Sequence, residues 1–151
     1  MVIVERPADM HNWVGKVIGT SDWLEITQEQ INKFAEATLD FQWIHVDVER
    51  AKKDMPGGKT IAHGYLSLSL VAGLGGQVYR IDKRSRGVNY GLNKVRFINP
   101  VPVGSRVRLS VKIANVENIT GGVRTTQEVT MEIEGQAKPV LVAETMVISY
   151  D

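Results

Sequence analysis

The stretch IAHGYLSLSLVAGLGGQVY, residues 61–79, contains no Asp, Glu, Lys or Arg and carries the strongest structural signal of the chain. Leucines recur at every fourth position from Leu66 to Leu74, which places them on one helical face. We therefore predict a helix over 61–74 that ends at the glycines of 73–76. Because this helix lacks a charged face, other elements must cover it on nearly all sides.

This apolar stretch does not have the composition of a membrane span. A span needs about 20 predominantly apolar residues. Here glycines and the polar side chains of His63, Ser67, Ser69 and Gln77 interrupt the run. The first ten residues also lack the unbroken apolar run of a signal peptide. We therefore predict a buried helix and no membrane partner.

The second half of the chain has the alternating pattern of β-strands. Val107, Leu109, Val111 and Ile113 alternate with polar residues, and Gly121-Gly122 marks a turn before the next alternating run. The predicted strands cover residues 106–113, 123–133, 140–150 and 89–98, with an early short strand near 14–18.

Together these elements predict an α+β protein with antiparallel strands and one very apolar helix. The simplest way to cover such a helix is a curved antiparallel sheet wrapped around it, which is the hot-dog fold. We predict a single domain over residues 1–151, because one hot-dog unit accounts for this length.

Composition narrows the function classes. The formal net charge is +1, which gives no reason to expect nucleic acid as a partner. The absence of cysteine excludes disulfides, thiolate catalysis and cysteine metal sites, and it fits a cytoplasmic protein. The three histidines form no cluster at ligand spacing in the sequence, so we predict no metal site.

Asp40 and His45 form the first candidate for chemistry. Thr27 has the spacing of a capping-box residue, so residues 27–39 are predicted to form a helix with Asp40 just past its end. We place both side chains in a loop, where a carboxylate and an imidazole five residues apart can hold one water and exchange its proton. The same spacing also occurs in proteins where Asp ends a helix and His is structural.

Gly64 is the second candidate. It lies at the predicted start of the apolar helix, where a bare backbone N–H can bind a developing oxyanion. The alternative is a glycine required for tight packing of the helix on the sheet. Together the three residues suggest addition of water to, or its removal from, a polarised carbonyl compound.

Basic and aromatic residues supply candidates for substrate binding. Arg84 and Arg86 can bind the phosphates of coenzyme A, or can simply lie on a solvated face. Aromatic side chains near the pair can line an acyl pocket, or can belong to the core. The predicted substrate-binding residues are Gln42, Trp43, His63, Tyr65, Arg84, Arg86 and Asn89.

Three segments together resemble a known family. FAEATLDFQWIH (34–45) resembles the hydratase-2 motif of the MaoC-like dehydratases, IAHGYLS (61–67) resembles their helix entry, and NYGLNKVRF (89–97) resembles a strand that follows. The segments occur in the family's order within about residues 13–149, and the mycobacterial single-hot-dog branch is the most similar. The motif usually reads Gly-Asp-x-Asn-Pro, whereas here Leu39 replaces the glycine and Gln42-Trp43 replaces Asn-Pro.

The resemblance implies an R-specific enoyl-CoA hydratase. Asp40 would be the base and His45 a candidate proton donor, with the Gly64 N–H on the thioester oxygen. The implied partner is an acyl-CoA or acyl-carrier thioester, coenzyme A being part of the substrate, so no separate cofactor is expected. Such domains usually form homodimers. The alternatives are a hot-dog acyl-CoA thioesterase and a non-catalytic acyl-binding subunit.

Overall fold

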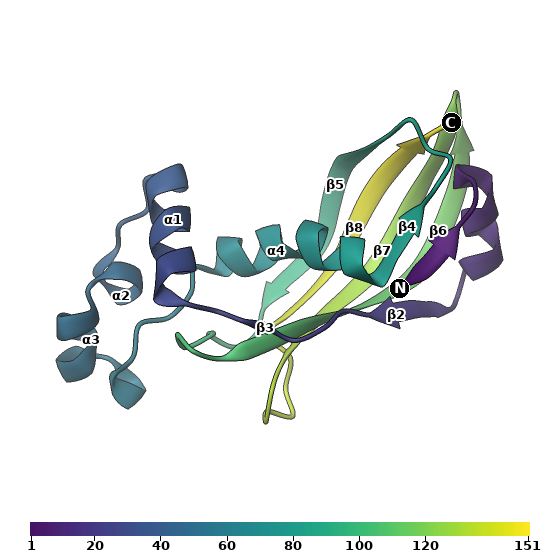
Figure 1. Cartoon of the computed structure of the whole chain (residues 1–151). Helices are drawn as coiled ribbons and strands as arrows, with labels where there is room; N and C mark the ends of the chain where they lie inside the picture. The colour runs from purple at the N-terminus through teal and green to yellow at the C-terminus, as the bar shows by residue number, and fades with distance from the viewer.

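The computed structural model describes residues 1–151 and contains one large antiparallel sheet (Figure 1). Its strand order is β2-β6-β7-β8-β5, and the short strand β3 also pairs with β6. Strands β6, β7 and β8 follow one another along the chain as a meander, and β5 adds to the far side of β8. The strand bounds are β2 (Val17–Thr20), β3 (Leu24–Glu25), β5 (Arg86–Phe97), β6 (Arg106–Ile119), β7 (Gly122–Ile133) and β8 (Leu141–Tyr150).

The sheet curves around a long helix, α4 (Gly64–Val78), as Figure 1 shows. This arrangement confirms the predicted hot-dog fold. The predicted bounds of the helix were wrong at both ends, because α4 starts three residues later and continues through Gly73, Gly75 and Gly76 to Val78. These glycines lie within the continuous helix and none has a positive φ, so they do not act as terminators. No helix of the structure is long and apolar enough to cross a membrane.

The core lies between α4 and the inner face of the sheet. Val107, Leu109, Val111 and Ile113 of β6 are fully buried, as their alternation predicted. Burying each such side chain stabilises the fold by roughly 1.5–3 kcal/mol. The outer face instead carries cross-strand ion pairs, which join Arg106 to Glu134, Arg108 to Glu132 and Lys112 to Glu128.

Two early elements differ from the prediction. The strand expected near residues 14–18 is β2 at Val17–Thr20, because Gly15 has a φ of 80° and turns the chain before it. A second, parallel sheet of β1 (Val2–Val4) and β4 (Tyr79–Ile81) was not predicted. Between β1 and β2 the chain forms the 3-10 helix η1 (Pro7–Trp13).

Three helices form a lobe at the N-terminal end of α4 (Figure 1). Helix α1 (Gln28–Thr38) begins as predicted, with the Thr27 hydroxyl accepting a hydrogen bond from the Gln30 N–H. The lobe continues through α2 (Trp43–Val46), α3 (Val48–Asp54) and the 3-10 turn η2 (Pro56–Gly58). It carries both Asp40 and His45.

Candidate active site

Asp40 lies directly after the C-terminus of α1. Leu39 ends the helix in the left-handed conformation, with φ 64° and ψ 21°, although its side chain is exposed. Asp40 Oδ1 then accepts a hydrogen bond of 3.3 Å from the Gln42 N–H, which closes a local turn. The carboxylate therefore has a fixed position while its side chain remains about half exposed, at 46%.

His45 lies in the short helix α2 rather than in the predicted loop. Its ring is buried, and Nδ1 lies 2.7 Å from the carbonyl oxygen of Ile61. Because a carbonyl oxygen only accepts, Nδ1 carries the hydrogen of neutral His45 and Nε2 carries the lone pair. Gln28 of α1 donates to the His45 carbonyl oxygen at 2.7 Å and ties the two helices together.

The environment keeps His45 neutral. Burial lowers the pKa of the His45 imidazole from its ordinary value of 6.5, and repulsion from the neighbouring His63 lowers that pKa further. The hydrogen bond to Ile61 and the charge of Asp40 act in the opposite direction but are smaller than the effect of burial. At pH 7 the Nε2 lone pair is therefore available to accept a proton.

His63 was predicted to bind substrate, and the structure places it inside the protein between Asp40 and His45. Its side chain is only 2% exposed, and Nε2 donates a hydrogen bond of 2.9 Å to the Asp40 carbonyl oxygen. The rings of His63 and His45 stack with centroids 3.9 Å apart. His63 is the residue directly before α4, and it contacts both Asp40 and His45. Its Nδ1 atom is buried without a hydrogen-bond partner.

The fold brings three possible ligands of a metal ion together. One ligand atom from each of Asp40, His45 and His63 lies within 4.8 Å of the other two. The sequence prediction of no metal site considered only local spacing, and His63 joins the group from 23 positions beyond Asp40. His45 Nδ1 and His63 Nε2 are already engaged with carbonyl oxygens, so each ring has one nitrogen left.

Gly64 is the first residue of α4 and borders a cavity of about 230 Å³. The first N–H groups of a helix have no partner within the helix, so they are free to bind an anion. A Cβ atom at Gly64 would lie 3.2 Å from the ring of Phe97, which is a very tight contact. Glycine therefore fits this position better than a larger residue. The same cavity also reaches His45 and is lined by Ile61, Ala62, Ser67, Ile98, Asn99, Pro100, Val101 and Val140.

The other predicted substrate-binding residues do not gather at this cavity. Arg84 and Asn89 line a second cavity of about 630 Å³ beside the C-terminal half of α4. The remaining four line neither cavity. Gln42 and Tyr65 are exposed, the Arg50 guanidinium covers the Trp43 ring at 4.0 Å, and Arg86 stacks on Tyr150 at 4.2 Å.

Some residues of the site were missed. Phe97 lines the smaller cavity against Gly64, and its ring lies 6.0 Å from that of Tyr65. The polar lining of the larger cavity, described below, was also missed. Its signal was present in the sequence, because Thr125 and Gln127 occupy inward positions of an alternating strand where apolar residues are expected.

The fold and these residues define a hot-dog protein with an aspartate and a histidine close together at the N-terminus of its central helix. The model of the MaoC like domain matches residues 9–135. The chain is 51% identical over 144 residues to 3-hydroxyacyl-thioester dehydratase Z of Mycobacterium tuberculosis, covering 95% of each protein. The alignment with nodulation protein N of Rhizobium leguminosarum shows 41% identity and covers 95% of this chain and 91% of that protein.

A solved structure has the same fold. The monoamine oxidase regulatory protein from Archaeoglobus superposes with a TM-score of 0.79 at 26% identity, over 99% of this chain and 97% of that chain. The chain therefore belongs to the MaoC-like dehydratase family, and it is an enzyme of the hydro-lyase class.

Proposed function

We propose that this protein is an R-specific enoyl-CoA hydratase, which reversibly converts a trans-2-enoyl-CoA to an (R)-3-hydroxyacyl-CoA. The observation that carries this proposal is the placement of the Asp40 carboxylate and the His45 Nε2 lone pair beside the N-terminus of α4. The name of the mycobacterial relative supports a 3-hydroxyacyl thioester as the substrate. The R stereochemistry and coenzyme A as the carrier rest on the resemblance to the hydratase-2 motif.

In the hydration direction Asp40 and His45 Nε2 accept hydrogen bonds from one water. As the water oxygen bonds to the β-carbon, one of the pair takes the released proton, and the pair then returns a proton to the α-carbon. His45 thus becomes a proton donor only after it has taken up a proton, because its neutral Nε2 has none. No cofactor takes part in this reaction, since coenzyme A is part of the substrate.

The electrons of the conjugated double bond move onto the thioester oxygen as water adds. The Gly64 N–H, at the positive end of the α4 dipole, would bind that oxygen. Removal of one such donor commonly costs about 2.7–4 kcal/mol in the transition state. The role of Gly64 is therefore to stabilise the enolate, while Asp40 and His45 move the proton.

A comparison of two glycines of α4 tests this role. Gly64→Ala introduces a methyl group against Phe97 at the point of oxyanion approach, and we expect kcat to fall by up to about 100-fold. The matched control is Gly73→Ala, where a Cβ meets nothing within 4 Å; we expect unchanged turnover and roughly 0.5–1 kcal/mol of added stability. Equal turnover in both variants would show that a Cβ at residue 64 does not obstruct the oxyanion, and would contradict the close approach proposed for Gly64.

Crotonyl-CoA distinguishes the proposed hydratase from the alternatives. We expect the absorbance of the conjugated thioester to fall with no release of free thiol. Thiol release would instead identify an acyl-CoA thioesterase, because that reaction breaks the carbon–sulfur bond. Binding of crotonyl-CoA without any change in absorbance or thiol would identify a non-catalytic acyl-binding subunit.

We also propose that two copies pair through β5. This strand is the last in the sheet and hydrogen-bonds only to β8, so its other edge is open along 12 residues. Val88, Tyr90 and Leu92 expose apolar side chains on the same strand. A second copy would cover this edge and these side chains together.

Light scattering should therefore give twice the 16.8 kDa mass of the chain. Val88→Lys, which places a charge on this edge, is expected to shift the protein to the monomer. Val17→Lys is the control, because Val17 is also exposed, on β2 at the opposite side of the sheet. A monomeric wild-type protein at micromolar concentration would refute the pairing.

A further inference from the structure

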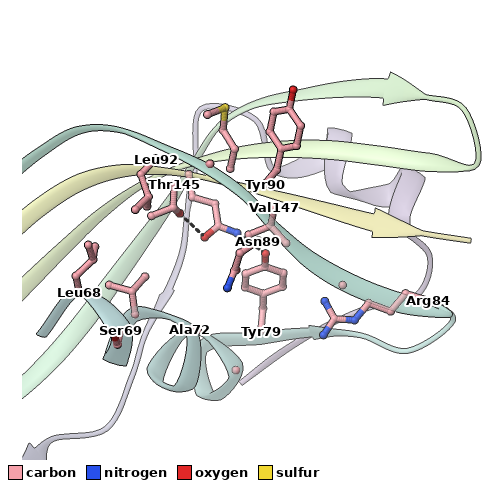
Figure 2. A pocket seen from close by; sticks show the side chains of 17 residues that line it. Leu68, Ser69, Ala72, Tyr79, Arg84, Asn89, Tyr90, Leu92, Thr145 and Val147 are labelled. Atoms are coloured by element: carbon pink, nitrogen blue, oxygen red, sulfur yellow. Dashed lines mark hydrogen bonds between the residues drawn. The ribbon is translucent and has the colours of Figure 1, made fainter. Parts of the chain in front are cut away.

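The larger cavity, of about 630 Å³, has a polar inner end that the proposed chemistry does not use. It lies between the C-terminal half of α4 and strands β5, β7 and β8 (Figure 2). Leu68, Ala72 and Leu92 form apolar parts of its wall, while Tyr79, Gln127 and Thr145 form a polar part. Its volume is in the range of cavities that hold a small organic ligand.

The inner face of the sheet changes from apolar to polar residues at this cavity. On β7, Val129 and Met131 are buried against the core, but Thr125 and Gln127 take the same inward direction further along the strand. The neighbouring strand β8 behaves alike, and Thr145 and Ser149 are its buried polar residues. Buried polar groups are costly without partners, so such a patch requires hydrogen bonds.

Thr145, Gln127 and Tyr79 form a hydrogen-bond chain that ends in the cavity, whereas the buried Thr125 Oγ1 has no partner. Thr145 Oγ1 donates to Gln127 Oε1 at 3.3 Å, and Gln127 Nε2 donates to the Tyr79 hydroxyl oxygen at 2.6 Å. Burial raises the pKa of Tyr79 to about 12, so its hydroxyl stays protonated. The hydroxyl oxygen accepts from Gln127, which leaves the hydroxyl hydrogen to be donated elsewhere. Figure 2 shows Asn89 pointing toward Tyr79 from β5.

The two cavities lie one after the other between α4 and β5. The smaller one takes Gly64 and Ser67 from α4 and Phe97 from β5, whereas the larger one begins at Leu68 and Leu92. Gly76, also in its lining, lies about 18 Å beyond Gly64 along the helix axis. If the thioester of a substrate is held at Gly64, an acyl chain of this length that extends along α4 therefore reaches the polar end of the larger cavity.

We propose that the larger cavity binds the far end of the acyl group and that this end carries a hydrogen-bond-accepting oxygen, such as a keto or hydroxyl group, received by Tyr79 and Asn89. This proposal rests on the proposed hydratase function and specifies its substrate class. A plain alkyl end would leave the buried Tyr79 hydroxyl without a partner for its hydrogen in the occupied cavity, whereas the exposed Asn89 amide can also be hydrated. Such a mismatch is a strong basis for discrimination between substrates.

The charge of the cavity argues against coenzyme A as its occupant. Its lining contains one charged side chain, Arg84, whereas coenzyme A carries several phosphate charges. Phosphate recognition commonly uses several cationic or backbone N–H donors together. A neutral acyl end with one or two oxygen atoms matches the Tyr79 and Asn89 donors better.

The test uses two trans-2-enoyl-CoA substrates of equal length whose extended acyl chains span about 18 Å, one with a keto group near the far end and one with an alkyl end. We expect the wild-type protein to show at least about tenfold higher kcat/KM for the keto substrate. Tyr79→Phe should bring the ratio of the two values close to one, and Thr145→Val, which removes a partner of Gln127, should lower it. Tyr150→Phe is the matched control and should keep the wild-type ratio, because Tyr150 lines neither cavity.

Each result separates this proposal from the hydratase function. Crotonyl-CoA hydration together with an equal or higher kcat/KM for the alkyl substrate would overturn the oxygenated acyl end and leave the hydratase standing. Absence of crotonyl-CoA hydration would overturn the hydratase itself. If Tyr79→Phe lowers kcat/KM equally for crotonyl-CoA and the keto substrate, the cavity holds the coenzyme end and the proposal is wrong.

Discussion

Replacing Asp40 with asparagine is expected to lower kcat for crotonyl-CoA hydration at least about 100-fold while leaving the fold intact. The amide of asparagine cannot accept a proton from water, whereas the carboxylate can. The structural contacts of Asp40 survive the change, because an asparagine Oδ1 can accept from the Gln42 N–H and the backbone oxygen still accepts from His63. An absorbance assay with crotonyl-CoA measures kcat, and circular dichroism spectra of the variant and the wild-type protein show whether the fold is intact.

The control is Asp54→Asn, an identical change on α3. Asp54 is exposed and pairs only with Arg50, so we expect wild-type turnover and nearly wild-type stability. If Asp40→Asn hydrates crotonyl-CoA at a rate close to that of Asp54→Asn, Asp40 is not the base.

Removal of His45 is expected to have an effect of similar size on activity and a further effect on stability. His45→Ala removes the Nε2 lone pair and leaves the Ile61 carbonyl oxygen without its donor, which costs about 1–3 kcal/mol. His45→Asn separates the two effects, because its amide nitrogen can replace Nδ1 as the donor but nothing replaces Nε2. We expect kcat to fall at least about 100-fold in both variants and stability to fall mainly in His45→Ala.

The pH profile gives an independent readout of His45. Since the pKa of folded His45 lies below 6.5, the imidazole stays neutral at pH 7 and becomes protonated only in more acidic solution. The kcat/KM of the wild-type protein should therefore be constant near neutral pH and fall below pH 6.5 as Nε2 gains a proton. A profile whose acid limb is unchanged in His45→Asn would assign that limb to another group.

The features of the fold that depend on local patterns could be predicted. The cap at Thr27 and the alternation around Leu109 follow from neighbouring residues, and the structure confirms both. The end of α4 could not be predicted in this way. Glycines favour helix ends, but the side chains of Leu74 and Val78 are buried in the core on either side of Gly75 and Gly76, and the helix continues through them. The three-residue strands β1 and β4 are also fixed by pairing between distant segments, for which a short sequence has no periodic signal.

In the candidate site, too, the features that depend on neighbouring residues could be predicted, whereas those that depend on distant contacts could not. Asp40 and His45 are five residues apart, so their proximity could be anticipated from the chain itself. The position of His63 depends on how the lobe docks against the start of α4, and its hydrogen bond to the Asp40 carbonyl oxygen joins residues 23 positions apart. Arg84 and Asn89 were selected for their chemistry, but the fold places them at the other end of the helix from Gly64.

Leu39 offers a route to a more heat-resistant form of this enzyme. A left-handed conformation costs a non-glycine residue roughly 1–2 kcal/mol, and the exposed leucine side chain gains little burial in return. Leu39→Gly would remove that penalty, although a more flexible unfolded chain would cancel part of the gain. A higher melting temperature of Leu39→Gly at unchanged turnover would show that thermal resistance and catalytic rate can be adjusted separately one residue away from Asp40.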